Sequence, residues 1–184
     1  MKRMLTIVLA AVLAIATILP VATEAPAAEK FRVCWSRYVG WEPWGWLNHA
    51  GIMKKWASKY GIEVSVEYVD DYLESINQLT NGTYKACAVT NMDTLNIPAA
   101  SGVETMALIV GDYSNGNDGL GLRNGKTVKD VAGRTVYLVE GSVSHYLWAR
   151  ALDLNGVPRK GVKIKNVSER EIEAVYLNDP NPKA

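Results

Sequence analysis

Short apolar runs alternate with amphipathic stretches along most of this chain. Residues 62–69 (IEVSVEYV) place an apolar side chain at every second position, which is typical of a strand. Residues 46–60 repeat apolar side chains at helical spacing, and Gly61 follows as a helix-ending residue. This alternation of strands and helices predicts an α/β fold built on parallel sheet.

The same patterns predict the other elements. The predicted strands cover residues 31–36, 62–69, 85–90, 106–110, 119–123, 135–139 and 162–167. The predicted helices cover residues 46–60, 71–81, 92–100, 127–131 and 142–154, and another begins at Ser168. Asp71 and Glu74 have the spacing of a capping box, and Ser142 is expected to cap the helix that follows it.

A break in composition divides the chain in two. Residues 111–119 (GDYSNGNDG) are too rich in Gly, Asn and Asp for a regular element. We therefore predict a first lobe over residues 29–111, a hinge over 112–118 and a second lobe over 119–184. The second lobe has only about three predicted strands, and a parallel sheet needs cover on both faces. We expect this lobe to be incomplete and the chain to be truncated.

The N-terminus has the three parts of a secretory signal peptide, predicted over residues 1–28. Lys2 and Arg3 precede an uncharged apolar run over residues 4–19, and small residues suitable for cleavage follow at 25–27. A membrane anchor is the alternative, but this run is shorter than the roughly 20 residues that span a bilayer. We expect cleavage and export to the periplasm.

Composition narrows the function classes. The chain is 48% hydrophobic and 21% charged, as in an ordinary folded domain. Its net charge is +1, without a basic run, so we expect no binding to nucleic acid or to the membrane surface. Signature motifs of hydrolases, nucleotide-binding folds and zinc proteases are missing, and two His with two Cys have no metal-site spacing. We expect no metal, no cofactor and no enzymatic activity.

The two cysteines, Cys34 and Cys87, both lie in short apolar runs. An oxidising compartment permits a disulfide between them. The interpretation we favour is two buried thiols that pack as small apolar side chains.

Four of the six tryptophans lie within residues 35–46, together with glycine and proline. This segment follows the carboxyl end of the first predicted strand, where open α/β sheets bind ligands. We expect Tyr38, Trp41 and Trp44 to contact a ligand through their aromatic faces. For Trp46 and Trp56 we expect core packing.

Three more segments carry candidate polar groups. Asn91 and Asp93 follow the third predicted strand, where Thr90 or Asn91 either caps a helix or helps to receive a ligand oxygen. Ser142 opens a similar strand-to-helix segment in the second lobe. Asp112 lies where the chain leaves the first lobe, and its side chain either points into a cleft or forms a turn.

Several of these segments together resemble one protein family. The motifs are residues 35–44 (WSRYVGWEPW), 54–62, 71–77, 90–93, 109–119 and 142–147. They are similar to motifs of the periplasmic substrate-binding proteins of nitrate/sulfonate/taurine-type ABC importers. The similarity is greatest to the branch associated with urea carboxylase, proposed to import urea- or guanidine-like nitrogen compounds. It extends from Phe31 to about Val175.

The resemblance implies a type II periplasmic-binding-protein fold, in which two lobes of parallel sheet close on a solute. It implies a small-molecule solute and an ABC permease as partners, no cofactor, and a monomer. Family members are longer, with a further stretch that completes the second lobe. The cleft residues that the resemblance carries onto this sequence are Ser36, Tyr38, Trp41, Trp44, Asn91, Asp93, Asp112, Ser142, Ser144 and His145.

The predicted function is therefore non-catalytic binding of a small polar nitrogen compound. The aromatic segment with Asp93 and Asp112 suits a planar cation such as guanidinium, whereas helix N-termini suit an anion such as nitrate or a sulfonate. One alternative is an enzyme related to the pyrimidine-precursor synthases of thiamine biosynthesis, but two scattered cysteines do not match the iron motif of that group. Another is the ligand-sensing domain of a regulator, which an export signal disfavours.

Overall fold

The computed structural model describes residues 27–178. Residues 1–26, which hold nearly all of the predicted signal peptide, and residues 179–184 lie outside the described part. Between residues 27 and 178, no helix is both long enough and apolar enough to cross a bilayer.

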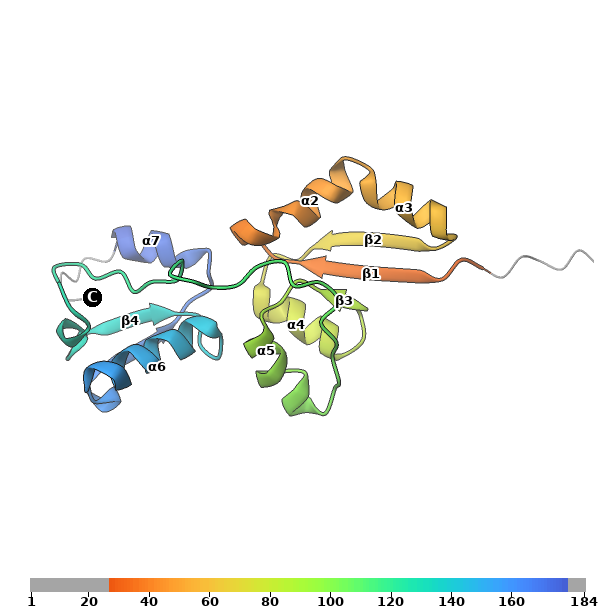
Figure 1. The fold of residues 1–184 in the computed structure, drawn as a ribbon. Helices are drawn as coiled ribbons and strands as arrows, with labels where there is room; N and C mark the ends of the chain where they lie inside the picture. Colours follow the sequence, from red (N-terminus) through yellow and green to blue (C-terminus); the bar gives the residue numbers. More distant parts are fainter. Residues whose placement is uncertain (1–26, 179–184) are drawn as a thin grey trace, which may run out of the picture.

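Three parallel strands form the first sheet, in the order β2-β1-β3. They are β1 (Lys30–Trp35), β2 (Glu63–Tyr68) and β3 (Ala86–Cys87). Helices lie on both sides of this sheet (Figure 1). The helices are α2 (Glu42–His49) and α3 (Ile52–Tyr60) on one face, and α4 (Tyr72–Thr80) and α5 (Asn91–Asn96) on the other. We call β1–β3 and α2–α5 the first lobe.

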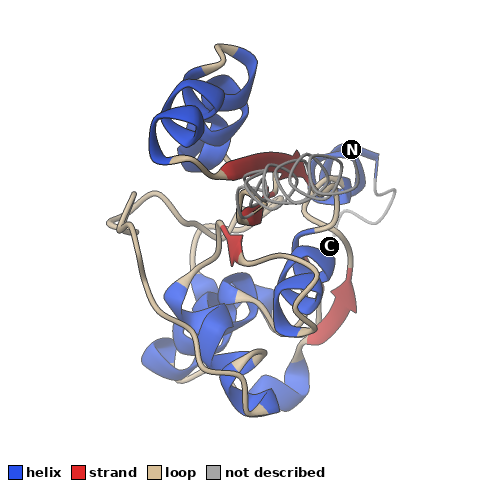
Figure 2. Ribbon diagram, turned by 90° about the vertical axis from the view of Figure 1, so that its right-hand side faces the viewer, coloured by secondary structure: helices blue, strands red, loops and turns tan. Residues whose placement is uncertain are grey.

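The second sheet pairs β4 (Thr135–Leu138) with β5 (Lys163–Asn166), again in parallel. Helix α6 (Val143–Asn155) covers one face and α7 (Glu171–Asn178) the other (Figure 1). These four elements are the second lobe. The two separate parallel sheets confirm the predicted α/β class. A long irregular segment, tan in Figure 2, leads from one lobe to the other, as Figure 1 shows.

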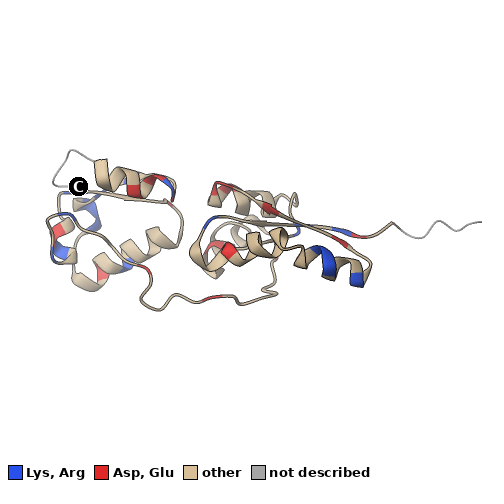
Figure 3. Cartoon of the chain, turned by 90° about the horizontal axis from the view of Figure 1, so that it is seen from above, with Lys and Arg blue, Asp and Glu red and all other residues tan. Residues whose placement is uncertain are grey.

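Short 3₁₀ helices complete the described secondary structure. They are η1 (Val39–Trp41), η2 (Ala99–Ser101), η3 (Val128–Val131) and η4 (Arg159–Gly161). Basic and acidic residues are interspersed over both lobes, which agrees with the near-zero net charge (Figure 3).

Side-chain caps fix where three helices begin. Asp71 accepts a hydrogen bond from the Glu74 amide at 2.9 Å. Ser142 accepts one from the Ser144 amide at 3.1 Å, so the predicted cap at Ser142 is confirmed, as is the Asp71 half of the predicted capping box. Thr90 caps α5 in the same way, by accepting from the amide of Asp93 at 3.2 Å. Each cap satisfies an amide that the first helical turn leaves unpaired.

The prediction of one continuous helix over residues 46–60 is wrong, because the structure has two helices there. Gly51, with a φ of 68°, separates α2 from α3, because a left-handed residue interrupts the helical path. The expectation of core packing for Trp46 and Trp56 is also wrong, since these side chains are 60% and 46% exposed. Trp56 instead stacks against Tyr60 on the surface of α3.

Two predicted strands are absent from the described structure, and a third is shortened. Residues 106–110 and 119–123 are irregular, and the strand predicted over 85–90 pairs only at β3. Met106 and Val110 are more than four-fifths exposed. An apolar run becomes a strand only beside another strand that pairs with its backbone groups, and within residues 27–178 neither run has such a neighbour.

Each lobe has its own apolar cluster. In the first lobe, Trp35, Val66 and Ala88 are buried beneath α2 and α3, with Trp41 and Trp44 packed against them. In the second lobe, buried side chains of η3, β4, α6 and the loops beside β5 form the cluster. They are Val131, Val136, Leu138, Trp148, Leu152, Val157 and Val162.

Glu67 on β2 gives the fold a predictable dependence on pH. Arg32 donates to both of its oxygens, at 3.0 and 2.6 Å, and Ser65 donates to one at 2.8 Å. The hydrogen bonds from Arg32 are the main cause that lowers the pKa of Glu67 from 4.5 to about 2. A group whose pKa is lowered on folding stabilises the protein above its unfolded pKa, and that stability is lost as pH falls through the folded value.

As pH falls from 4.5 to about 2, we therefore expect the free energy of unfolding to decrease more steeply in the wild type than in Glu67→Gln. Urea unfolding at several pH values measures this difference. Glu63→Gln, at the exposed ion pair with Lys30, is the matched control and should leave the slope nearly unchanged. Equal slopes for wild type and Glu67→Gln would contradict the prediction.

Candidate functional site

The carboxyl ends of the two parallel sheets are turned toward each other. Asp70, in the loop after β2, forms an ion pair with Arg170, in the loop after β5, at 2.6 Å. Asn96 at the end of α5 donates to the carbonyl of Gly141, after β4, at 2.7 Å. Loops that follow strands in open α/β sheets are where ligands bind. The candidate site is therefore the region between these facing loops.

Three aromatic rings meet at the first-lobe side of this region. The ring of Tyr38 lies 4.8 Å from that of Trp41 and 5.3 Å from that of Tyr72, between centroids. Trp41 and Tyr72 lie 5.5 Å apart. We call these three residues the aromatic cluster. Tyr38 and Trp41 are half-buried, so part of each ring faces outward, whereas Tyr72 is buried.

Asp93 lies beneath the aromatic cluster and is fully buried. Its Oδ2 accepts hydrogen bonds from the Tyr72 hydroxyl at 2.5 Å and from the Thr90 hydroxyl at 2.8 Å. Its Oδ1 has no hydrogen-bond partner among residues 27–178, although it is shielded from solvent. A buried oxygen without a donor is costly, so Oδ1 needs a donor that the described residues do not supply, which is a water molecule or a ligand group.

Ser36, directly after β1, is the second buried polar residue of this lobe whose side chain is unsatisfied. It is fully buried, and its Oγ has no hydrogen-bond partner in the described part of the chain. The carbonyl of Ser36 accepts from the Tyr38 amide at 3.0 Å, which fixes the turn that leads into the aromatic cluster.

The electrostatic setting of the aromatic cluster is acidic. Burial is the main cause that raises the pKa of Tyr38, and the nearby carboxylates of Glu169, Asp93 and Asp71 raise it further. Burial also raises the pKa of Tyr72, followed by its hydrogen bond to Asp93. Glu169 belongs to the second lobe and lines the same cavity as Tyr38, so carboxylates of both lobes act on Tyr38. Such a setting favours a cation over an anion.

Of the three predicted site residues in the second lobe, two make local hydrogen bonds and one lines a cavity. Ser142 is buried and fully engaged, since its hydroxyl donates to the Val139 carbonyl at 2.7 Å while it caps α6. His145 accepts from the Gly141 amide through Nδ1 at 3.1 Å. Ser144 is exposed and lines a cavity. The hydrogen bonds of Ser142 and His145 thus serve the local structure of the helix start.

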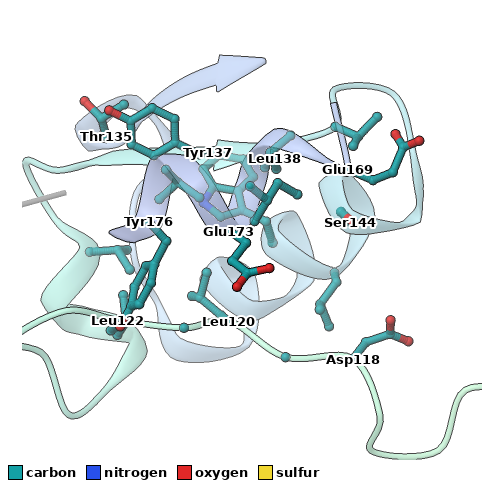
Figure 4. A pocket seen from close by; sticks show the side chains of 18 of the residues that line it. Asp118, Leu120, Leu122, Thr135, Tyr137, Leu138, Ser144, Glu169, Glu173 and Tyr176 are labelled. Carbon is teal, nitrogen blue, oxygen red and sulfur yellow. The ribbon is translucent and has the colours of Figure 1, made fainter. Parts of the chain in front are cut away.

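A cavity of about 560 Å³ lies in the second lobe, between the sheet, α7 and the incoming chain. Glu173 and Tyr176 of α7 face Leu120 and Leu122 across it (Figure 4). Tyr38 of the first lobe also lines this cavity, so it reaches the space between the lobes. A smaller hollow of about 250 Å³ joins loops of both lobes near Asp71, Asn166 and Glu169.

The remaining predicted residues of the first lobe and hinge are Asp112, Asn91 and Trp44. The carboxylate of Asp112 lies over Gly40, where an added Cβ would be 2.8 Å from Oδ2. Asn91 is exposed at the start of α5. Trp44 is half-buried against the first-lobe apolar cluster. Within the part of the chain that the structure describes, no group of three or more His, Cys, Asp or Glu side chains has the arrangement of a metal site.

Three further residues belong to the site and were not predicted. They are Asp71, Tyr72 and Glu169. Asp71 and Tyr72 lie where α4 begins, after the short loop that follows β2, so the expectation of ligand-binding residues after the carboxyl ends of parallel strands also covers them. Glu169 precedes α7, and its sequence neighbourhood has no comparable signal.

Removing the Tyr72 hydroxyl tests the network around Asp93. Tyr72→Phe leaves Asp93 Oδ2 with one donor fewer and leaves the Thr90 amide without the acceptor that lies 3.3 Å away. We expect a loss of about 1–3 kcal/mol in the free energy of unfolding, measured with urea. Tyr60→Phe, at an exposed ring, is the control and should change it by less than about 0.5 kcal/mol. Equal effects would contradict the network.

Solved structures with a similar fold include SsuA proteins. The periplasmic aliphatic sulphonate binding protein SsuA from Escherichia coli aligns with 82% of this chain at 15% identity, with a TM-score of 0.57. The alkanesulfonate-binding protein SsuA from Xanthomonas axonopodis pv. citri, bound to MOPS, aligns with 84% of it at 14% identity, with a TM-score of 0.61.

The chain spans about half the length of these structures, 48% and 53%. No family model and no curated protein matches the sequence. At such low identity the likeness concerns the fold and leaves the ligand open. Over its described residues, this chain has an α/β fold similar to that of these two SsuA proteins, as the resemblance implies.

Proposed function

We propose that this chain is the solute-binding component of an ABC importer outside the cytoplasm, and that it binds a small planar nitrogen cation such as guanidinium between its lobes. The observation that carries the proposal is Asp93. This carboxylate is buried beneath the aromatic cluster, and its Oδ1 has no hydrogen-bond partner among the described residues. A ligand N–H group supplies the missing donor, and a cation supplies the opposite charge.

The aromatic cluster adds a second kind of contact. The half-buried rings of Tyr38 and Trp41 meet edge to face beside Asp93, through their shared contact with Tyr72. A planar cation over such a ring gains about 0.5–2 kcal/mol. Glu169 of the second lobe lines the same cavity as Tyr38. A ligand in this cavity beside Tyr38 therefore contacts both lobes.

Contacts from both lobes also give the mechanism. A ligand that binds to Asp93 on one side and near Glu169 on the other favours the closed arrangement over the open one. The ion pair between Asp70 and Arg170 and the hydrogen bond from Asn96 to Gly141 then hold the rims of the facing loops together. The closed form delivers the solute to a membrane permease.

Sulfonate binding is the second candidate, because the two SsuA structures compared above are named for it. The carboxylates of Asp71, Asp93 and Glu169 near Tyr38 oppose an anion at this position. We therefore favour the cation.

Calorimetric titration of the full chain with guanidinium, urea, nitrate and taurine distinguishes the candidates. We expect saturable heat from guanidinium, a weaker response to urea, which lacks the charge, and none from nitrate or taurine. Saturable heat from only the two anionic or zwitterionic compounds would replace the cation with a sulfonate-like ligand. Silence from all four would overturn the proposed substrate class.

A further inference from the structure

We propose that Cys34 and Cys87 form an intramolecular disulfide in an oxidising environment, and that this bond ties β3 to β1 beneath the ligand site. The two residues are register partners on adjacent parallel strands. Partners in register point their side chains to the same face of a sheet. Neighbouring strands lie about 4.8 Å apart, which is within the range of Cα separations that disulfides bridge.

Both sulfur atoms approach the same residue of α4. Cys34 Sγ lies 3.7 Å from the carbonyl oxygen of Ser75, and Cys87 Sγ lies 3.5 Å from its hydroxyl oxygen. This shared neighbour shows that the two side chains converge beneath the helix. In the structure both cysteines are free thiols, with Cys34 buried and Cys87 half-buried. The favoured sequence interpretation, two thiols, thus describes the reduced form.

The two thiols are suited to different steps of the exchange. Cys87 is the more accessible, and its contact with Cys34 is the main cause that lowers its pKa, while burial opposes this and the contact with Ser75 adds to it. The pKa of Cys34 is raised, first by its hydrogen bond with Cys87 and then by burial. A thiolate is the attacking species in thiol–disulfide exchange, so Cys87 reacts first with an external disulfide.

The reaction balances with a low-molecular-weight disulfide as the oxidant. The Cys87 thiolate attacks one sulfur of the oxidant, which forms a mixed disulfide and releases one thiol. Cys34 then loses its proton and attacks Cys87 Sγ, which forms the protein disulfide and releases a second thiol. In total the two protein thiols lose two hydrogen atoms, and the oxidant is reduced to two thiols.

The expected consequence is a firmer first lobe. β3 pairs with β1 over only two residues, so few backbone hydrogen bonds hold it. β1 leads directly to Ser36, and β3 leads through the loop that carries Thr90 into α5, which carries Asp93. A disulfide between the strands fixes these two ends relative to each other. It also closes a long loop of the unfolded chain, which lowers the entropy of the unfolded state.

The test uses the folded full chain, equilibrated in a mixture of reduced and oxidised glutathione, then quenched with acid and alkylated in denaturant. We expect a monomer that has lost two hydrogen atoms, a peptide that links Cys34 to Cys87, and alkylation only after reduction. The midpoint of thermal unfolding should rise on oxidation by about 10 °C. In Cys34→Ala/Cys87→Ala the midpoint should not respond to oxidation.

Three results would overturn the inference. Two alkylated cysteines after equilibration would show that the strands do not bring the sulfurs within reach. A persistent glutathione adduct on Cys87 would show that Cys34 does not attack it. A disulfide that lowers the midpoint of unfolding would show that the bond distorts the sheet. None of these results depends on which solute the protein binds.

Discussion

Replacing Asp93 with asparagine is expected to abolish guanidinium binding while the fold persists. The amide oxygen of the new side chain can still accept from the hydroxyls of Tyr72 and Thr90, as Oδ2 of Asp93 does. The amide nitrogen then takes the place of Oδ1 and presents a donor where the ligand needs an acceptor. Losing the charge and the acceptor together should weaken binding at least about 100-fold in calorimetric titration.

The matched control for Asp93→Asn is Glu74→Gln. It removes one negative charge from exposed Glu74 on the neighbouring α4 and should leave the affinity within about a factor of two. The midpoint of thermal unfolding of Asp93→Asn, measured beside the titration, separates lost binding from lost folding. Wild-type affinity in a folded Asp93→Asn variant would remove Asp93 from the site.

The largest effect on stability is expected from Trp35→Ala. Trp35 is buried at the centre of the first-lobe apolar cluster, against Val66 and Ala88. Truncating a buried tryptophan to alanine should cost about 3–5 kcal/mol in the free energy of unfolding, measured with urea. Trp56→Ala makes the same truncation at a half-exposed ring and should cost less than about 1.5 kcal/mol. Similar losses at both positions would contradict this packing.

Gly45 provides an independent check on the position of Trp35. A Cβ added at Gly45 would lie 2.6 Å from Cζ2 of the Trp35 ring, which is too close for two carbon atoms. Gly45→Ala should therefore destabilise the wild type by about 1–3 kcal/mol. In the Trp35→Ala background the ring is gone, so the same change should be neutral or stabilising, as expected for alanine in a helix. Additive losses would contradict the contact.

The sequence correctly predicted the helix starts that depend only on residues close by in the chain. Asp71 and Ser142 begin helices because their side chains accept from nearby amides, and such caps require no distant partner. Residues 106–110 show the opposite case. Their apolar, β-branched composition favours a strand, but pairing depends on a partner from elsewhere in the chain, and in the described residues they lie exposed.

For the candidate site too, the sequence predicted some features and not others. The position of Tyr38, Trp41 and Asp93 at the ends of parallel strands could be predicted, because those ends meet at one edge of a sheet. The contact of Tyr72 with Asp93 and the approach of Glu169 from the other lobe could not, because they depend on how α4 and the second lobe pack.

The most direct test of solute binding between the lobes is a crystal structure of the full chain with guanidinium, supplied well above its calorimetric dissociation constant. We expect the cation within hydrogen-bond distance of Asp93 Oδ1, with its plane against Tyr38 or Trp41 and with Glu169 on its far side. A guanidinium bound elsewhere, with Asp93 Oδ1 still without a partner, would contradict the proposed site.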